Sequence, residues 1–567
     1  MGISLLAEPA SLWSSLGRIV FVLFAVAFPL NGSAGAAQAD MSFDVLVYGG
    51  TSAGVMAAYT AKMQGHSVLL VERGRHLGGM SSGGLGRTDF GSREAITGLS
   101  RDFYRRIAEY YGEEGLGLTF EPKAAEDIFE FYVDTADVEV MFSRQVVSVE
   151  KEESEIESVT LEYAGEGKGG SELVVAAEEF IDTSYEGDLM ARAGVSFTVG
   201  RESNDKYDET LNGVQPSWFT GSYDEMERRD VWSDEASPYV VSGDSSSGLL
   251  PEIHGVGLEP TGTGDDKVQA YNFRMCLCQG EDNIPIPQPP NYDPQRYELL
   301  ARRIEEDPPD DLSDLFIISE MLEGKTDWNN WGYAGLSTDY IGGSWEYPEA
   351  SYPERDSIWQ EHREYQQGLV YYVTHNESVP EHIREEMQTW GYCPDEFLDT
   401  GGWPHALYIR EARRMVGEYV MTENDIVGEY VDDGIALGSY PMDSHDTERV
   451  AIKRSDGTMR IKHEGGGNVG GFDPYPISYR SLTPKREEVT NLLVPVALSA
   501  SHIAFGSIRM EPVFMKLGQA AGAAVVMALE RNVPVQKVDV EMLREELFEN
   551  PMADGTGPPS SAYRLDM

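Results

Sequence analysis

A glycine turn between two apolar runs, followed at a set distance by an acid, most constrains what this chain can fold into. Residues 43–72 read FDVLVYGGTSAGVMAAYTAKMQGHSVLLVE. One apolar run stops at Gly49-Gly50, an alanine-rich helical pattern follows, and a second apolar run ends at Glu72. Strand, tight turn, helix, strand and acid in this order predict a dinucleotide-binding βαβ unit within an α/β fold.

Each position of this unit has a physical role. Gly49 permits the tight turn, Gly54 lets the helix pack on the strands, and the helix N-terminus offers free N–H groups to a pyrophosphate. Glu72 is placed to accept hydrogen bonds from a ribose. Thr51 departs from the pattern, because the middle position is glycine in the usual fingerprint. An ordinary strand-to-helix turn is the alternative. The predicted contacts are Gly49, Gly50, Thr51, Ser52, Ala53, Gly54, Glu72 and Arg73.

A glycine-dense loop comes directly after the acid. Residues 78–86, GGMSSGGLG, have five glycines. Without Cβ atoms, such backbone can lie flat against a planar ring system, although a mobile surface loop has the same composition. The residues expected at the ring are Gly78, Gly79, Met80 and Gly84.

These motifs resemble a family of FAD-dependent oxidoreductases that have the two-dinucleotide-binding-domain flavoprotein fold. The resemblance rests on GGTSAG, the acid and HLGGMSSGGLGRTDFG. It continues at residues 180–190, 271–276 and 499–524, and so covers about residues 43–530. It implies bound FAD, without a covalent link, and the fold class is a Rossmann-like FAD-binding domain split by an inserted α+β substrate domain. The further cofactor contacts that we expect are Val146, Gly187, Asp188, Gly518, Gln519 and Ala520.

Similar flavoproteins of the heterodisulfide reductase type have iron–sulfur clusters. This chain has three cysteines, Cys276, Cys278 and Cys393, which cannot supply the four thiolates of a typical cluster. Cys276 and Cys278 should share one face of a strand. We interpret them as small buried residues in preference to a redox pair. We predict no metal site.

The pattern along the chain predicts five segments. Residues 1–39 read as a signal peptide, 43–200 and 481–549 as the two parts of the FAD-binding domain, 201–480 as the inserted domain, and 550–567 as a surface tail. Residues 137–150 resemble a strand pair or hairpin near the adenine. Eight of the nine tryptophans fall in residues 218–403, where they form either an aromatic core or a platform for sugar rings.

The N-terminus and the charge bear on where the protein works. Arg18 precedes the apolar run 19–30, and Ala37-Gln38-Ala39 has the A-x-A form of a cleavage site. We therefore expect export to the periplasm or the extracellular space, without a stable membrane anchor; an uncleaved anchor is the alternative. The net charge of −52 disfavours binding to nucleic acid, and the acid excess with little lysine suggests a saline habitat.

Candidate catalytic groups follow from what flavin chemistry requires. A base near neutral pKa would take the proton of a substrate hydroxyl, and histidine is the natural type. The candidates are His502 and, with nearby acids, His445; His405 is a third. In residues 507–511, SIRME, a strand would place Arg509 and Glu511 on one face. Arg509 could hold a substrate carboxylate or reduced flavin, or pair with Glu511 as structural support.

We interpret the chain as an exported FAD-dependent oxidoreductase that oxidises a hydroxyl-bearing, carbohydrate-like small molecule. One alternative is a small carboxylic acid as substrate, held by Arg509 and Arg274. The other is a non-catalytic binding module that keeps the flavoprotein fold. The electron acceptor is unknown, and no second complete fingerprint indicates a permanently bound nicotinamide.

Overall fold

The computed structural model describes residues 39–165, 171–229, 236–330, 336–428 and 431–555, and the backbone of residues 232–233. From residue 39 onward the chain forms one compact unit. The predicted signal peptide lies outside the described residues apart from its last position. So do the last twelve residues of the predicted tail, 556–567.

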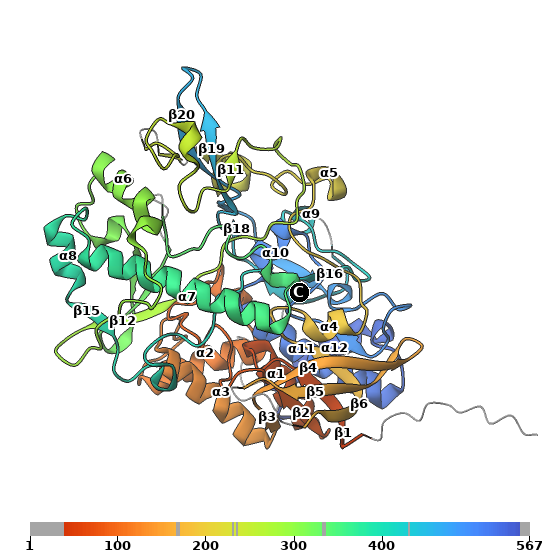
Figure 1. Ribbon diagram of the computed structural model, residues 1–567. Helices are drawn as coiled ribbons and strands as arrows, with labels where there is room; N and C mark the ends of the chain where they lie inside the picture. The colour runs from red at the N-terminus through yellow and green to blue at the C-terminus, as the bar shows by residue number, and fades with distance from the viewer. Residues whose placement is uncertain are drawn as a thin grey trace, which may run out of the picture. The chain divides into compact units, whose positions relative to one another are not determined.

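A mixed seven-stranded sheet forms the centre of the nucleotide-binding half (Figure 1). Its strands follow the order β3-β2-β1-β6-β5-β4, and β23 also pairs with β6. Strand β1 runs parallel to β2 and β6, so the apolar run and the run before Glu72 lie side by side, as predicted. The bounds are β1 Met41–Tyr48, β2 Val68–Val71, β3 Glu139–Met141, β4 Arg144–Glu152, β5 Glu155–Tyr163, β6 Leu173–Asp182 and β23 Leu492–Leu493.

The expected hairpin at residues 137–150 is wrong. Strand β3 pairs in parallel with β2 at one edge of the sheet, whereas β4 pairs with β5 at the other end of the strand order. Between them Ser143 has a left-handed backbone, and its N–H donates to the Gly74 carbonyl. The Arg144 N–H donates to the Glu72 carbonyl. These bonds hold the segment between β3 and β4 against the loop after β2, and the two strands do not pair with each other.

Two helices pack so closely that only glycine fits between them. They are α1 (Ser52–Met63) and α11 (Glu511–Arg531). A Cβ at Gly518 would lie 2.1 Å from the Ala53 carbonyl oxygen, and one at Gly522 would lie 2.5 Å from that of Ala57. Helix α11 is long and apolar enough to cross a membrane, but 89% of that stretch is buried inside the protein. Its apolar character therefore reflects a core helix.

Further helices complete the same half. Helix α2 packs against both α3 and α11, and α12 packs against α11. The bounds of these helices and of the other helices outside the middle of the chain are α2 Gly98–Tyr110, α3 Pro122–Ala136, α4 Asp188–Arg192, α5 Asn204–Tyr207, α9 Glu423–Ile426, α10 His502–Ile508 and α12 Val540–Glu549.

The middle of the chain has an aromatic core of its own. Trp328 and Trp403 are fully buried there with Tyr297 and Tyr365, which supports the core interpretation for these two tryptophans. The predicted helical region is present as α7 and α8. The elements are β12 Met275–Gln279, β13 Ile317–Glu320, β14 Lys325–Asn329 and β15 Trp390–Tyr392, which form one sheet, and α6 Glu298–Glu306, α7 Tyr352–His375 and α8 Glu381–Met387.

Smaller sheets join the two halves. Residues such as Met442 and Ile435, from the predicted insert, belong to the same buried cluster as α1 and α11. The strands are β7 Phe197–Thr198, β8 Trp218–Ser222, β9 Glu227–Arg229, β10 Trp232–Ser233, β11 Gly255–Val256, β16 Arg414–Met415, β17 Gly434–Gly438, β18 Met442–Ser444, β19 Glu448–Lys453, β20 Met459–Glu464, β21 Gly467–Gly470 and β22 Tyr475–Ser478.

The start of the predicted tail packs on the protein. Pro551 and Ala553 are buried, and the Pro551 carbonyl accepts a hydrogen bond from the Gln519 amide. This segment therefore closes over α11 as far as residue 555.

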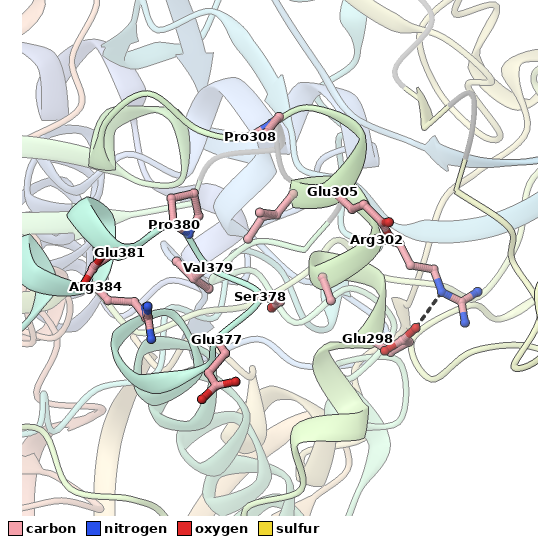
Figure 2. A pocket seen from close by; sticks show the side chains of 12 residues that line it. Glu298, Arg302, Glu305, Pro308, Glu377, Ser378, Val379, Pro380, Glu381 and Arg384 are labelled. Atoms are coloured by element: carbon pink, nitrogen blue, oxygen red, sulfur yellow. Dashed lines mark hydrogen bonds and ion pairs between the residues drawn. The ribbon is translucent and has the colours of Figure 1, made fainter.

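A surface pocket of 590 Å³ lies between α6 and the segment that leads into α8 (Figure 2). Its wall includes Glu298, Arg302, Glu377 and Arg384, and Glu298 accepts a hydrogen bond from Arg302 at 2.7 Å. None of its lining residues belongs to the βαβ unit or to the predicted catalytic groups. The candidate site lies elsewhere.

Candidate functional site

A pocket of 440 Å³ opens where β1 gives way to α1. It brings together the glycine turn, the acid after β2 and the start of the glycine-dense loop, with Tyr347 and Trp359 from the middle of the chain. The predicted cofactor residues that line it are Gly49, Gly50, Thr51, Glu72, Arg73, Gly79 and Asp188. The βαβ motif and the loop therefore form one site.

The turn itself shows why Thr51 is tolerated in place of glycine. Thr51 is the N-cap of α1: its hydroxyl accepts a hydrogen bond from the Gly54 N–H at 3.2 Å and donates to the Thr183 carbonyl at 2.8 Å. The side chain thus fixes the helix start. Gly49 has φ of +108°, and a Cβ there would lie 2.7 Å from the Ser184 nitrogen, so this position requires glycine.

Glu72 lies in the pocket wall, where backbone amides hold its side chain. Its carboxylate accepts hydrogen bonds from the backbone N–H groups of Gly50, at 2.6 Å, and Gly74. Burial raises the pKa of Glu72, and these two amides oppose the shift. A ribose hydroxyl can add a further hydrogen bond to a carboxylate held in this way.

A stacked pair of histidines forms the other wall. The rings of His76 and His405 lie 4.0 Å apart and nearly parallel. His76 contacts Glu126 at 2.8 Å and Asp399 at 3.2 Å, and these carboxylates outweigh burial and raise its pKa. Burial, with the neighbouring His76, lowers the pKa of His405 to about 3. Neither ring nitrogen of His405 has a hydrogen-bond partner among the described residues.

Several predicted cofactor residues do not line the pocket but contact residues that do. A Cβ at Gly54 would lie 1.9 Å from the Gly49 carbonyl oxygen, so Gly54 allows the helix-to-strand contact. The Gly78 N–H donates to the Gly50 carbonyl, and the Met80 N–H donates to the Tyr185 hydroxyl. The predicted residues that do not line this pocket are Ser52, Ala53, Gly54, Gly78, Met80, Gly84, Val146, Gly187, Gly518, Gln519 and Ala520.

Three of the later predictions have protein partners. The backbone carbonyl of Val146 accepts a hydrogen bond from the Tyr352 hydroxyl at 2.8 Å. The side chain of Gln519 accepts from the Leu99 N–H at 3.0 Å, in the third turn of α11. Gly518 and Ala520 are buried in the same helix.

Asp188 is the first residue of α4, after Gly187 with a left-handed backbone. Its carboxylate pairs with Arg355 at 2.8 Å, Arg413 at 2.9 Å and Arg192 at 3.2 Å. Burial opposes ionisation, but these guanidinium groups lower the pKa of Asp188. Its negative charge is therefore fixed at the pocket wall.

The strand predicted at residues 507–511 is wrong, because this segment joins two helices. Arg509 is the C-cap of α10, and Glu511 begins α11. The two side chains do not pair with each other: Arg509 contacts Asp443 at 2.8 Å, while Glu511 accepts hydrogen bonds from Tyr185 at 2.7 Å and Ser81 at 3.2 Å. Burial raises the pKa of Glu511, which lies against the glycine-dense loop.

Tyr408 connects that loop with a second group of charged residues. Its ring packs in one cluster with Met80 and Leu85, and its hydroxyl accepts a hydrogen bond from Arg509 at 3.0 Å. On the same side, a Cβ at Gly84 would lie 2.3 Å from the Arg274 carbonyl oxygen. The glycine-dense loop thus lies between the pocket, which Gly79 lines, and this charged group, which Gly84 contacts.

We call this group the polar cluster. Its members, contributed by segments far apart in the sequence, are Asp89, Arg274, Asp327, Asp339, Tyr408, Arg410, Asp443, His445 and Arg509. Each arginine has its own carboxylate: Arg274 binds Asp327 through two hydrogen bonds, at 2.9 and 2.5 Å. Arg410 contacts Asp339 at 2.9 Å. A small pocket of 10 Å³, whose wall includes Asp89 and Tyr440, touches the cluster at Asp89.

His445 lies between two carboxylates of the cluster. Its Nδ1 is 2.7 Å from Asp339, and its Nε2 is 3.4 Å from Asp443. The side chain keeps 16% of its surface exposed. By contrast, His502 is buried: its Nδ1 contacts Glu411 at 2.8 Å and its Nε2 contacts the Ser444 hydroxyl at 3.2 Å. Of these two predicted bases, His445 alone has partial access.

Sequence reasoning missed Asp339, Asp327 and Tyr408, which complete the site. Asp339 and Asp327 lie in no glycine motif and beside no other candidate, so no local pattern marks them. Tyr408 lies three residues after the candidate His405, in GGWPHALYIREARR. Asp89 carried one signal, since it directly follows the glycine-dense loop in GRTDFG. Asp443 was visible as a neighbour of His445.

Comparison with known proteins gives one family match and several similar solved structures. The model of the family described as FAD dependent oxidoreductase matches residues 44–547. Similar solved structures include the OxyS anhydrotetracycline hydroxylase from Streptomyces rimosus (14% identity, TM-score 0.22, 29% of this chain and 36% of that chain). A second is THI4 from Thermovibrio ammonificans (17% identity, TM-score 0.23, 30% of this chain and 71% of that chain). A third is 3-ketosteroid-delta4-(5alpha)-dehydrogenase from Rhodococcus jostii RHA1 (14% identity, TM-score 0.21, 27% of this chain and 48% of that chain).

The matched segment therefore spans well under two thirds of the first and third of these structures. No protein with a curated description matches the sequence. The family match, however, runs through both parts of the nucleotide-binding half and through the polar cluster. It identifies FAD as the cofactor. The chain belongs to the family of FAD-dependent oxidoreductases.

Proposed function

We propose that this enzyme oxidises a hydroxyl-bearing, carbohydrate-like small molecule at the polar cluster, with His445 as the base. The observation behind the proposal is that each arginine of the cluster is paired with its own aspartate. A hydroxyl can accept a hydrogen bond from a guanidinium and donate one to the adjacent carboxylate. A neutral polyol therefore satisfies such pairs without adding charge to a buried site.

The pocket at the βαβ unit would hold the adenosine and pyrophosphate part of FAD, and the flavin ring would lie along the glycine-dense loop beside the polar cluster. The N-terminus of α1 and the turn at Gly49-Gly50 would hold its pyrophosphate, and Glu72 its ribose. The unpartnered nitrogens of His405 leave a donor or acceptor available in the pocket wall. When bound, FAD supplies the acceptor for the hydride.

The chain's own groups manage the proton. His445 Nε2 would take it from the substrate hydroxyl, while Asp339 holds Nδ1–H and stabilises the imidazolium that forms. Arg509, fixed by Asp443, would bind the substrate oxygen together with Tyr408.

Anaerobic single-turnover reduction tests this proposal. The FAD-loaded protein is mixed with a panel of sugars, polyols, hydroxy acids and simple carboxylic acids, and loss of the oxidised flavin absorbance is followed. We expect a sugar or polyol to reduce the flavin. We expect His445→Gln to slow that step about 10²–10⁴-fold while FAD stays bound.

His502→Gln is the matched control. It should lower the melting temperature, because Glu411 and Ser444 lose a partner, yet reduce its flavin at the parent rate. A slow His502→Gln with a normal His445→Gln would contradict the assignment of the base. Reduction by none of the compounds would favour the non-catalytic binding module.

A small carboxylic acid is the second candidate. Three buried donors, Arg509 Nε, Arg410 Nε and Gln269 Nε2, have no hydrogen-bond partner among the described residues. An anionic oxygen would satisfy them. Against this, Asp339 and Asp443 already neutralise the two arginines, so a further carboxylate would meet like charges. Reduction by acids alone would favour this candidate.

We also propose that the enzyme works outside the cytoplasm. Support comes from the apolar run 19–30, preceded by Arg18 and followed by the Ala37-Gln38-Ala39 site. Sequencing the N-terminus of the protein from the periplasmic or culture fraction tests this. A mature N-terminus at Asp40 is expected, and an intact Met1 in the cytosolic fraction would contradict it.

A further inference from the structure

The fold gathers all three cysteines of the chain at one place. Cys276 and Cys278 lie on β12, two residues apart and so on one face. Strand β15 pairs with β12 so that Tyr392 is opposite Leu277, and the next residue, Cys393, meets Cys276. The two Sγ atoms are 3.8 Å apart. The sequence interpretation of two inert buried cysteines did not include Cys393.

Cys393 occupies the centre of this group. The thiol of Cys276, 3.8 Å away, and that of Cys278, which packs against the same cluster, lower the pKa of Cys393, and the nearby Lys325 ammonium favours its thiolate. Burial and the bond to Cys393 raise the pKa of Cys278 to about 12. Of the three thiols, Cys393 therefore loses its proton most readily.

Lys325 is fixed beside the thiols by three carboxylates. Its Nζ lies 2.5 Å from Glu121, 2.7 Å from Glu396 and 2.9 Å from Asp395. These acids could otherwise hold a metal ion. Because an ammonium already sits among them, they position a cation for the thiolate.

A pocket of 430 Å³ gives access from solvent. Its wall includes Cys278, Lys325, Asn283 and Asp395. Cys276 and Cys393 are buried and do not line it. A small molecule that enters this pocket would therefore meet Cys278 first and Cys393 behind it.

We propose that Cys278 and Cys393 form a thiol–disulfide exchange centre for a low-molecular-weight disulfide, separate from the flavin site. The Cys278 sulfur attacks one sulfur of the small disulfide as its proton passes to Cys393, and one small thiolate leaves. Cys393 then attacks the Cys278 sulfur, its proton going to the second small thiolate. The protein gains one disulfide, and the small disulfide is reduced to two thiols.

Cys276 is a positioning residue in this scheme. Its thiol donates to Cys393 from the buried side and helps to keep the charge there. Met321 links the centre to the flavin site, because it packs with Cys276 and Cys393, and a Cβ at Gly86 would fall 1.7 Å from its sulfur.

The experiment uses the FAD-loaded full chain and oxidised glutathione as probe. After incubation, free thiols are blocked and peptides are mapped by mass spectrometry. We expect a disulfide between the peptides of Cys278 and Cys393. Cys393→Ser, which lacks the group that takes the Cys278 proton, should form a glutathione adduct on Cys278 more slowly and stop there, and Cys278→Ser should not react. Cys276→Ser is the matched control and should still form the disulfide, several-fold more slowly.

Retained flavin absorbance shows that each variant is folded, and Cys393→Ala replaces Cys393→Ser if the serine variant loses flavin. Three results would overturn the proposal: no reaction of the parent, a parent that stops at the glutathione adduct, or a Cys276–Cys393 disulfide formed by Cys278→Ser. None of them depends on turnover of a flavin substrate.

Discussion

At the scale of single residues, two buried ion pairs of the polar cluster differ in their surroundings. Arg274 and Asp327 are joined by two short hydrogen bonds and are almost fully buried. Arg509 and Asp443 are held by one such bond, and Asp443 also faces His445. In the first pair, both carboxylate oxygens of Asp327 already accept a hydrogen bond from Arg274. In the second pair, Asp443 lies 3.4 Å from His445, and Arg509 donates a hydrogen bond to the Tyr408 hydroxyl.

Asp327→Asn should therefore destabilise the protein. It would leave Arg274 charged and without its ion pair in a buried site, which typically costs about 3–5 kcal/mol. Urea unfolding at neutral pH measures the loss. The control is Glu227→Gln, which breaks an exposed pair with Arg229 and should cost less than about 1 kcal/mol. Equal effects of the two substitutions would contradict a structural role for the buried pair.

Lys516 gives a prediction about pH. It is buried in α11 with Gln519 as its neighbour at 3.3 Å, and burial lowers its pKa to about 7. The unfolded lysine titrates near ~10.4, so between the two values the unfolded chain binds a proton that the folded chain lacks. Stability from this group consequently rises with pH across that window, by about 1.4 kcal/mol for each unit of pKa difference.

Lys516→Met removes this dependence. The variant should melt at a higher temperature than the parent at pH 6 to 7, and the gap should close toward pH 10. Thermal melts across this range measure the difference. A variant that is less stable than the parent at every pH would show that the ammonium has a favourable partner in the fold.

At the scale of elements, the sequence predicted correctly those features that depend on interactions between residues close together in the chain. The turn at Gly49, the helix that follows and the acid after β2 depend on backbone geometry encoded within thirty residues, and they are where the sequence placed them. The hairpin failed because β3 and β4 find partners far away in the chain. The SIRME strand failed because Ser501 caps α10 and Pro512 lies in the first turn of α11.

Those two signals were readable in the sequence. A serine before HIAFG and a proline after glutamate both mark helix starts, and they outweigh three alternating polar residues. The polar cluster was only half predictable. His445, Arg274 and Arg509 were chosen from local motifs, while Asp339 and Asp327 are brought to them by long-range packing that no single segment encodes.

The contact between α1 and β1 gives the prediction at this scale. Gly54→Val would place side-chain atoms against the Gly49 carbonyl, which lies 1.9 Å from the added Cβ. The helix must move, and the pyrophosphate site moves with it. We expect at least a tenfold loss of FAD content in the purified variant, measured from the ratio of flavin to protein absorbance.

Gly255→Ala is the control for this experiment, because a Cβ there meets nothing within 4 Å and its backbone is not left-handed. It should keep the FAD content of the parent. A Gly54→Val protein with full FAD would contradict the assignment of this turn as the phosphate site.

At the scale of the whole molecule, the net charge of −52 sets the response to salt. Like charges repel across the folded surface, and this repulsion is relieved when the chain unfolds and expands. The Debye length falls from about 10 Å at 0.1 M salt to about 3 Å at 1 M, so added salt screens most of the repulsion. The paired charges of the polar cluster are buried and are screened much less.

The melting temperature should therefore rise by several degrees between low salt and about 1 M NaCl, in line with a saline habitat. Thermal melts at fixed pH measure it, with FAD in excess so that cofactor loss does not limit stability. Sucrose is the control, because it favours compact states without screening charge. A rise with sucrose equal to that with NaCl would point to solute exclusion alone. A melting temperature that falls with NaCl would show that surface ion pairs, and not net repulsion, dominate the electrostatics of the folded chain.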